Sequence, residues 1–279
     1  MDNQSITPKL IEQMNYTDFI SFIKETNRCP GGKGTIRKII QNSFINRDSK
    51  ILEIGSNTGF TSLEIAHSVK CNVTGIDVSK SCVSEANSLL SEDSPEIKRI
   101  ASFKEGSAYD IPYANDTFDL VITGGATSFM EEKSRAVSEY KRVLKTWGFL
   151  SVTQLFYITK PPQEVVNKVS KSIGVKIEPW TEKDWLDVFT SSGSDLELYY
   201  YEKNELTNRS ENVIKDYINY FMKKPHLNEY SEDIKLSVKS KWREYIDIFN
   251  ENHKYLGYFI ALFRKRAYPE EPELFIKKQ

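Results

Sequence analysis

The sequence has few cysteines, and they form no paired pattern. Cys29, Cys71 and Cys82 are the three cysteines in 279 residues, and they are widely separated. A disulfide framework needs an even set of cysteines, and a structural zinc site needs closely spaced ligand pairs. We therefore expect three reduced thiols, no disulfide and no bound metal.

Long apolar runs and an excess of one charge are also missing. The most apolar stretch, residues 255–263, is too short to cross a bilayer as a helix, and residues 1–10 are polar, unlike a signal peptide. The 38 Lys and Arg residues balance 39 Asp and Glu, with no long basic run to follow a phosphate backbone. We expect a cytoplasmic protein with neither a membrane nor a nucleic acid as partner.

The middle of the chain alternates short apolar runs with segments of helical periodicity, which is typical of strand–helix–strand units in a parallel sheet. Glycine, asparagine or serine flanks each apolar run, as expected at turns. Strands are expected at 51–54, 73–77, 103–105, 120–123 and 149–155. Helices are expected at 61–69, 81–90 and 133–145, the last with Trp147 on its inner face and Gly148 as a left-handed cap.

The second half of the chain predicts two more strands and a helical insertion. Thr181 begins a helix that ends at Gly193, and strands follow at 196–201 and 255–264. Between them, apolar residues recur at helical spacing from 211 to 253. The sequence therefore predicts an α/β fold, with a doubly wound, mostly parallel seven-stranded sheet, helices on both faces, and a helical cap before the last strand.

This pattern also predicts the domain organisation. We expect an N-terminal helical lid at 1–49, a core at 50–204 and 253–279, and a cap at 205–252. A cap inserted between the last two strands is expected to cover the carboxyl edge of the sheet, where ligands of open α/β folds bind.

The strongest chemical signal is the segment Ile-Leu-Glu-Ile-Gly-Ser-Asn-Thr-Gly-Phe-Thr at residues 51–61. An apolar strand enters a turn that holds two glycines and opens directly into a helix. Glycine has no Cβ, so the backbone of such a turn can approach a ligand closely. A dinucleotide fingerprint would need glycines at positions 57 and 60, where Asn57 and Phe60 stand, so pyrophosphate binding is disfavoured.

The spacing Glu53-x-Gly55-x-x-x-Gly59 resembles the first motif of the class I, Rossmann-like S-adenosylmethionine-dependent methyltransferases of small molecules. The resemblance continues to about residue 155. Asp77 closes the second strand, where a carboxylate can accept hydrogen bonds from both ribose hydroxyls. Residues 106–113 resemble the stretch that packs against adenine, with Ser107 in place of the usual aspartate.

The resemblance implies S-adenosylmethionine as cofactor, S-adenosylhomocysteine as product, and a set of cofactor-binding residues. In the family, an acid at the position of Glu53 orders the loop near the methionine end of the cofactor. Asn57 replaces the usual middle glycine, and asparagine tolerates the left-handed backbone that this position needs. The implied set is Glu53, Gly55, Ser56, Asn57, Thr58, Gly59, Asp77, Val78, Ser107, Ala108, Thr123 and Gly124.

Residues 118–125 resemble the fourth strand of the family, whose end borders the reacting methyl group. Asp119 begins this strand and is expected to be structural. Thr-Gly-Gly-Ala at 123–126 replaces the Asn/Asp-Pro-Pro-aromatic motif of enzymes that methylate flipped bases, which favours a small-molecule acceptor. By analogy with the N-terminal region of relatives, we expect Tyr16, Arg28 and Thr35 to line the acceptor site, although residues 27–35 are equally compatible with a surface loop. Gly125, at the open end of the fourth strand, and Phe129 are the other expected acceptor residues.

The sequence determines less about which residue takes up a proton and which residues surround the methyl acceptor. An imidazole titrates near neutral pH, so His226 and His253 are candidate bases, whereas His67 is expected to face solvent. Lys223-Lys224 is expected to be a solvated helix end. The many aromatic residues after position 180 are compatible with an acceptor pocket or with ordinary core packing.

Together these features predict methyl transfer to an oxygen or nitrogen atom, less readily to carbon, by in-line displacement. Such a reaction needs no metal and no covalent nucleophile. A silent homologue that binds the cofactor for regulation, an RNA or protein methyltransferase, and an NAD-dependent oxidoreductase remain alternatives. A monomer and a homodimer are both compatible with the sequence.

Overall fold

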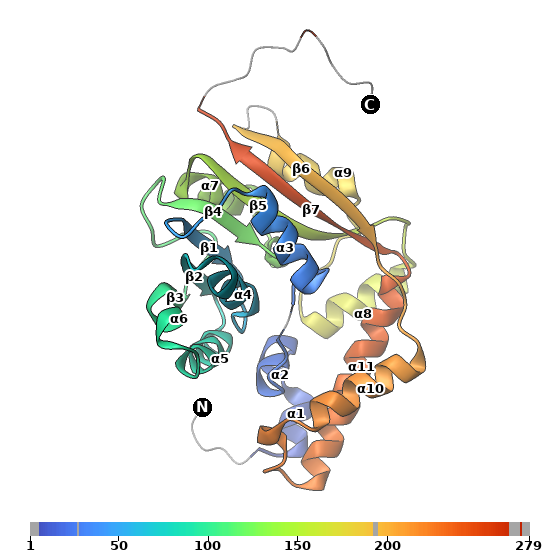
Figure 1. Cartoon of the computed structure of the whole chain (residues 1–279). Coiled ribbons are helices and arrows are strands. Elements are labelled where there is room, and N and C mark those ends of the chain that lie inside the picture. The colour runs from blue at the N-terminus through green and yellow to red at the C-terminus, as the bar shows by residue number, and fades with distance from the viewer. Residues whose placement is uncertain (1–5, 27, 192–194, 268–273, 275–279) are drawn as a thin grey trace.

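The computed structural model describes residues 6–26, 28–191, 195–267 and 274 (Figure 1). Gly193, the expected end of the helix after Thr181, lies outside these residues. No helix in the described ranges is long and apolar enough to cross a membrane.

A seven-stranded sheet forms the centre of the molecule. Its order is β3-β2-β1-β4-β5-β7-β6; β1 to β5 pair in parallel, and β7 runs antiparallel to both β5 and β6. The α/β prediction is therefore confirmed. The strands are β1 (Lys50–Ile54), β2 (Asn72–Asp77), β3 (Ala101–Glu105), β4 (Phe118–Thr123), β5 (Leu144–Tyr157), β6 (Leu196–Glu205) and β7 (Leu256–Lys265).

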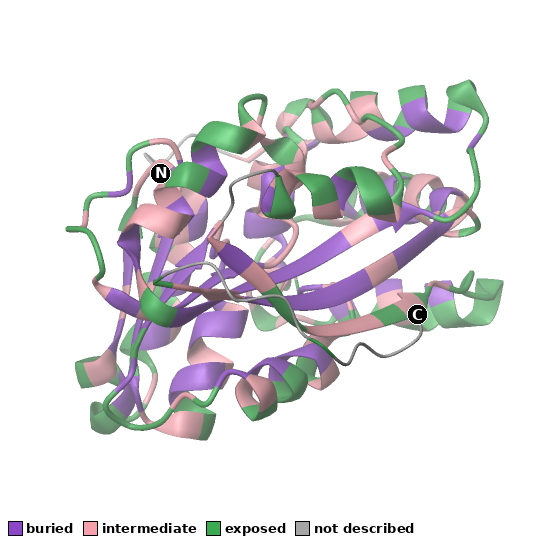
Figure 2. Cartoon of the chain, turned by 90° about the horizontal axis from the view of Figure 1, so that it is seen from above, coloured by how far each residue is buried: buried purple, intermediate pink, exposed green. Residues whose placement is uncertain are grey.

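Helices cover both faces of the sheet, which explains why the central strands read as continuous apolar runs. Neighbouring strand residues face opposite sides, so Ile51 joins one apolar cluster whereas Leu52 and Ile54 join the other. Figure 2 shows that the buried residues concentrate in these strands. One cluster includes α3 (Gly32–Asn42), α4 (Phe60–Val69), α5 (Lys80–Ser91) and α6 (Pro95–Ile100), and the other α7 (Lys133–Val143) and α9 (Glu182–Thr190).

A third apolar cluster joins helices from the two ends of the chain (Figure 1). Phe19 lies against Trp242 and Tyr245, with ring centroids 6.0 and 5.6 Å apart. The first two helices of the expected lid thus form one helical layer with the expected cap, whereas α3 packs on the sheet. The members of the layer are α1 (Pro8–Gln13), α2 (Tyr16–Phe22), α10 (Glu211–Met222), η2 (Pro225–Leu227) and α11 (Glu232–His253), and α8 (Gln163–Ile173) packs against α11.

Basic side chains of the cap bind the carbonyl ends of the N-terminal helices. Lys241 Nζ donates to the backbone oxygens of Ile11, Glu12 and Met14 at 2.9, 2.7 and 2.5 Å. The last carbonyls of a helix have no partner within the helix and carry partial negative charge, so a cation there stabilises the helix end. The cap therefore holds α1 in place by both packing and charge.

Two local predictions were wrong. The helix α7 already ends at Val143, and β5 begins at Leu144. Trp147, with φ 67°, is left-handed and exposed, and Gly148 is not the cap. Gly148 is needed for space instead, because a Cβ there would lie 2.9 Å from the backbone oxygens of Asp119 and Lys145. The expected helix start at Thr181 is present, and it has a capping box with Asp184 as its acid.

Replacing Lys241 by Met removes the three hydrogen bonds to α1 and retains a similar aliphatic length. We expect amide hydrogen exchange in α1 and α2 to accelerate at least about tenfold while exchange in the sheet is unchanged, because hydrogen bonds from a charged group contribute about 1.5 to 3 kcal/mol. Hydrogen-exchange mass spectrometry measures this. Lys239→Met, at an exposed position of the same helix, is the matched control, and equal exchange in both variants would contradict the prediction.

Candidate cofactor and acceptor site

The turn between β1 and α4 requires glycine at both of its ends. Gly55 and Gly59 have φ values of 68° and 86°. A Cβ on Gly55 would lie 2.4 Å from Cβ of Ala126, and one on Gly59 would lie 2.6 Å from the ring of Phe103. Asn57 has φ 48°, so its backbone is left-handed as expected. The turn therefore presents its backbone at close range on the carboxyl side of β1.

The carboxylate of Asp77 connects this turn to the end of β2. Its Oδ2 accepts from the backbone N–H of Asn57, and its Oδ1 accepts from that of Ser79, both at 2.9 Å. A carboxylate has about four lone-pair positions, so these two bonds orient the group and leave capacity for a ligand. Asp77 is half-buried and borders the main cavity.

The loop after β3 forms the next side of the cavity. Residues 106–109 line it together with Val78, which is 72% exposed. Ser107 Oγ accepts a hydrogen bond from the backbone N–H of Tyr109 at 3.1 Å. The hydroxyl can still donate one bond, whereas the aspartate that is usual in the family could only accept.

A small polar pocket of about 50 Å³ lies behind the turn. Glu53 borders it and is 4% exposed; its Oε2 accepts from the backbone N–H and the hydroxyl of Ser62, at 2.9 and 2.6 Å. Desolvation raises the pKa of Glu53 to about 7, although the bonds from Ser62 oppose the shift. The buried Ser56 hydroxyl, on the same pocket, has no hydrogen-bond partner among the described residues. This pocket suits a polar or charged end of a ligand.

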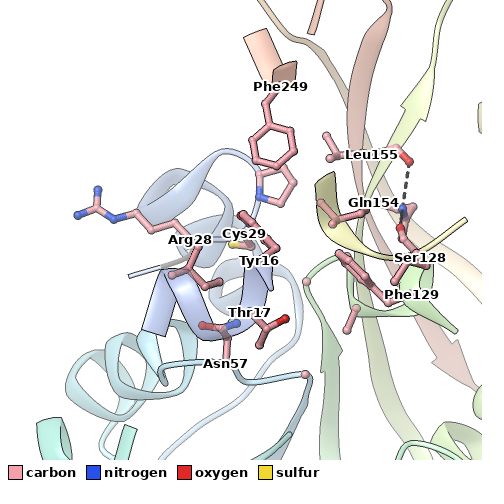
Figure 3. A pocket seen from close by; sticks show the side chains of 18 of the residues that line it. Tyr16, Thr17, Arg28, Cys29, Asn57, Ser128, Phe129, Gln154, Leu155 and Phe249 are labelled. Atoms are coloured by element: carbon pink, nitrogen blue, oxygen red, sulfur yellow. Dashed lines mark hydrogen bonds between the residues drawn. The ribbon is translucent and has the colours of Figure 1, made fainter. Parts of the chain in front are cut away.

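The main cavity has a volume of about 1520 Å³. Sites for single drug-sized ligands measure about 300–1,000 Å³, so this space can hold a nucleoside and a second molecule together. Figure 3 shows Thr17 and Asn57 near each other, and Ser128, Phe129 and Gln154 across from Tyr16. The carboxyl ends of the strands thus line one side of the cavity, and helices from the N-terminal and C-terminal parts of the chain line the other.

The structure brings most of the expected site residues together and places some apart. Glu53 and Ser56 border only the small pocket, and the main cavity is lined by Gly55, Asn57, Asp77, Val78, Ser107, Ala108, Gly124, Tyr16, Arg28, Gly125, Phe129 and His253. Thr58, Gly59, Thr123, Thr35 and His226 border neither space.

The residues outside the cavity hold the backbone around it. Thr35 Oγ1 donates to the Pro30 oxygen at 2.5 Å, and Thr58 Oγ1 donates to the Glu25 oxygen at 3.2 Å. The Thr123 hydroxyl lies 3.0 Å from that of Thr127. These hydroxyls therefore fix the loop before α3, the contact between α2 and the glycine turn, and the end of β4.

Three side chains outside the cofactor motif have clear structural surroundings. Asp119 accepts from the backbone N–H of Lys50 at 2.8 Å and from Lys145 at 2.7 Å, at the start of β4, in agreement with a structural role. His67 is exposed and pairs with Asp93 at 2.8 Å, as expected. Lys224 was wrongly expected to be solvated.

The ammonium of Lys224 donates to the Lys24 oxygen and lies 4.3 Å from the ring centroid of Phe221. It borders the main cavity, and desolvation lowers its pKa. The two-lysine pattern gave no sign of this, because the hydrogen-bond partner, Lys24, lies 200 residues earlier in the chain.

Sequence reasoning missed a polar group on the acceptor side. Gln154 Nε2 donates to Ser128 Oγ at 2.6 Å, and Tyr157 OH donates to Asn252 Oδ1 at 3.1 Å. A glutamine within the apolar run 149–157 was a usable signal, since a buried polar residue in a central strand needs a partner. No local pattern around Asn252 indicated that the end of α11 would lie against Tyr157 of β5.

In the described part of the chain, no three His, Cys, Asp or Glu residues gather in a way that could hold a metal ion.

The raised pKa of Glu53 makes stability depend on pH. Between its ordinary value of 4.5 and about 7, the folded protein holds a proton that the unfolded chain has released, so the free energy of unfolding falls as pH rises. Over this range we expect the ligand-free protein to lose up to about 3 kcal/mol relative to Glu53→Gln, which has no such proton. Denaturant unfolding of both proteins at several pH values measures the difference, and parallel pH profiles would contradict it.

Comparison with known sequences agrees with this geometry. Residues 52–152 match the family described as "Methyltransferase domain". An uncharacterized protein of Haemophilus influenzae is 27% identical over 178 residues, which are 63% of this chain and 70% of that protein. The chloroplastic 2-methyl-6-phytyl-1,4-hydroquinone methyltransferase 1 of Oryza sativa is 34% identical over 100 residues, 36% of this chain and 28% of the plant protein. This chain thus spans well under half of the plant protein.

Solved structures share the fold. The MccD protein is 24% identical with a TM-score of 0.72, covering 86% of this chain and 100% of that one. Phosphoethanolamine N-methyltransferase 2 of Haemonchus contortus, solved with S-adenosylhomocysteine, is 14% identical with a TM-score of 0.69, covering 94% and 61%. The [4+2]-cyclase SpnF is 18% identical with a TM-score of 0.68, covering 89% and 93%. Residues 52–152 therefore form a methyltransferase domain, and the fold and the glycine turn are those of the class I S-adenosylmethionine-dependent methyltransferases.

Proposed function

We propose that this protein transfers a methyl group from S-adenosylmethionine to an oxygen or nitrogen atom of a small acceptor. The observation that carries the proposal is the shape of the main cavity. One continuous space of about 1520 Å³ joins the edge at Asp77 and Ser107 to a region enclosed by aromatic side chains of the helical layer. A cofactor and an acceptor can therefore meet there without leaving the protein interior.

The cofactor fits the residues on the strand side of the cavity. The Asp77 carboxylate is oriented to accept from two ribose hydroxyls, and the Ser107 hydroxyl is free to donate to the adenine ring. The small pocket with Glu53 and the unpartnered Ser56 hydroxyl suits the methionine amino and carboxylate groups. When bound, S-adenosylmethionine supplies a methyl group on a positively charged sulfur.

The contribution of the chain itself is alignment and exclusion of water, which is what an in-line displacement needs. Tyr16 and Phe249 come from opposite ends of the chain, with ring centroids 5.5 Å apart, and both border the cavity. The helical layer, in which Lys241 of α11 binds the end of α1, therefore covers the site on the side opposite the strands. We propose that the acceptor is a free small molecule, and that the protein works without nucleic acid or membrane, as a monomer or homodimer.

Of the two histidines considered as bases, only His253 borders the cavity. Burial lowers its pKa, and the charge of Arg209 acts in the same direction, so the imidazole is neutral and able to take a proton from the acceptor. His226 Nε2 instead lies 3.1 Å from the backbone oxygen of Phe22 and binds the end of α2. We propose His253 as the proton acceptor.

Asp77→Ala is expected to weaken S-adenosylhomocysteine binding by about 1.5 to 3 kcal/mol, because charge-assisted hydrogen bonds to the ribose are lost. Asp77→Asn, which keeps one carbonyl oxygen, should lose less. Titration calorimetry measures both. Asp119→Asn is the matched control, since it changes the same residue type at the opposite end of the sheet. Equal affinity of Asp77→Ala and the parent protein would refute the ribose assignment.

The decisive experiment for the reaction uses S-adenosylmethionine labelled in its methyl group with a small-metabolite extract. Transfer of label to an extract component supports the enzyme. If S-adenosylhomocysteine but not NADH raises the melting temperature of the protein, and no label is transferred, the protein is a catalytically inactive homologue that binds the cofactor. The cyclase among the structural relatives shows that this fold is compatible with other chemistry, so the binding and transfer measurements are both needed.

With the acceptor found in that way, His253→Gln is expected to lower kcat/KM about 100-fold or more, because a positioned base contributes a factor of about 10² to 10⁴. The acidic limb of the pH profile should disappear in this variant, and affinity for S-adenosylhomocysteine should stay constant. His226→Gln retains a side chain able to bind the Phe22 oxygen, so it serves as the control. The same loss in both variants would argue against His253 as the base.

A further inference from the structure

Arg209 lies in the loop between β6 and α10, at the edge of the main cavity. Its backbone is held by Asn250 of α11: the N–H of Arg209 donates to Asn250 Oδ1 at 2.7 Å, and Asn250 Nδ2 donates to the Arg209 oxygen at 3.1 Å. The neighbouring Asn208 Nδ2 donates to the backbone oxygen of Asn250 at 2.9 Å. Three hydrogen bonds thus fix the point on α11 from which the Arg209 side chain extends.

The guanidinium of Arg209 has an aromatic neighbour but no anionic one. It lies over the ring of Tyr217, 5.0 Å from the ring centroid, and both residues border the cavity. Among the described residues, no carboxylate forms an ion pair with it and no side-chain or backbone oxygen accepts from it. Arg209 is exposed, so its five N–H donors are accessible to a ligand that enters the cavity.

The other cationic side chains around the cavity already have partners or point elsewhere. Lys133 and Lys224 donate to backbone oxygens, and Lys176 pairs with Glu178 at 3.1 Å. Figure 3 shows that the Arg28 side chain points away from the side chains across the cavity. Arg209 is therefore the cation of this cavity, within the described ranges, that is best placed to pair with a charge on a ligand.

Arg209 also lies close to the proposed base. His253 follows Asn250 by three residues on α11, and residues at this spacing are neighbours on one face of a helix. Burial lowers the pKa of His253, and the charge of Arg209 adds to this shift, an effect that salt screens beyond about 8 to 10 Å. A group held by Arg209 thus lies within the length of a small molecule from the atom that gives up its proton to His253.

The cavity wall beside Arg209 is aromatic. The rings of Tyr217 and Phe221, one turn apart on α10, have centroids 5.0 Å apart, and both residues border the cavity. The Tyr217 hydroxyl donates to Glu25 Oε1 at 3.0 Å, so its proton is already used. This wall therefore offers ring faces to an apolar body and the guanidinium to an anionic end.

We infer that Arg209 binds an anionic group of the methyl acceptor, a carboxylate or a phosphate, and so orients the acceptor for transfer. This inference rests on the proposed function. A planar guanidinium can bind either group through two parallel N–H bonds, which gives direction as well as affinity. A molecule of the same shape without the charge cannot form this pair, which is the physical basis of the selection.

The test compares benzoate with benzamide, which has the same ring and nearly the same shape but no charge, and uses phenyl phosphate as a second anion. Affinities for the protein saturated with S-adenosylhomocysteine are measured by ligand-observed NMR titration. We expect at least one of the two anions to bind at least about tenfold more tightly than benzamide, as one charge-assisted contact allows. The tighter of the two distinguishes a carboxylate from a phosphate. In Arg209→Met the ratio is expected to fall to about one.

Arg37→Met is the matched control, because it removes another exposed arginine, on α3, that borders neither the main cavity nor the small pocket. It should retain the preference for the anion, and both variants should bind S-adenosylhomocysteine as the parent protein does. An unchanged ratio in Arg209→Met, an equal loss in Arg37→Met, or no preference of the parent protein for either anion would overturn the inference. Failure of the parent protein to bind S-adenosylhomocysteine would instead count against the proposed function.

Discussion

The carboxylate of Asp77 is the interaction on which the site depends, because it connects two loops that would otherwise be independent. It binds the backbone N–H of Asn57 in the glycine turn and that of Ser79 at the start of α5. The turn itself exists only because Gly55 and Gly59 adopt left-handed conformations in positions where a Cβ would clash. A single side chain thus holds the loops after β1 and β2 together at the edge of the same cavity.

The second constraint is the helical layer over the carboxyl edge of the sheet. α1 and α2 have few residues and contact the sheet little, so they depend on α10 and α11 for burial. Cationic side chains of the cap reach the carbonyl ends of both N-terminal helices: Lys241 binds the end of α1 and Lys224 binds the Lys24 oxygen beyond α2. Closure of the cavity is therefore a joint property of the two chain ends.

Burial also sets the chemistry of the ionisable groups. Glu53 is enclosed beside the glycine turn, so its pKa rises to about 7 despite two hydrogen bonds from Ser62. The same physical effect acts in the opposite direction on bases, and the pKa values of His253 and Lys224 are lowered. Buried ionisable groups thus border both the small pocket and the main cavity, and such groups are characteristic of functional sites.

The sequence by itself determined the sheet, the glycine turn and Asp77. Apolar periodicity and turn residues are local signals, and the spacing from Glu53 to Gly59 lies within a single strand–turn–helix unit. Its errors were also local in origin: the helix after residue 133 was extended past Val143 because Trp147 continued its apolar face, although strand pairing decides that boundary. Tertiary structure alone decided that His253 reaches the cavity and that Thr35 and His226 do not. The placement of His226 depends on its contact with Phe22, 204 residues earlier in the chain, and no local pattern exists for such a contact.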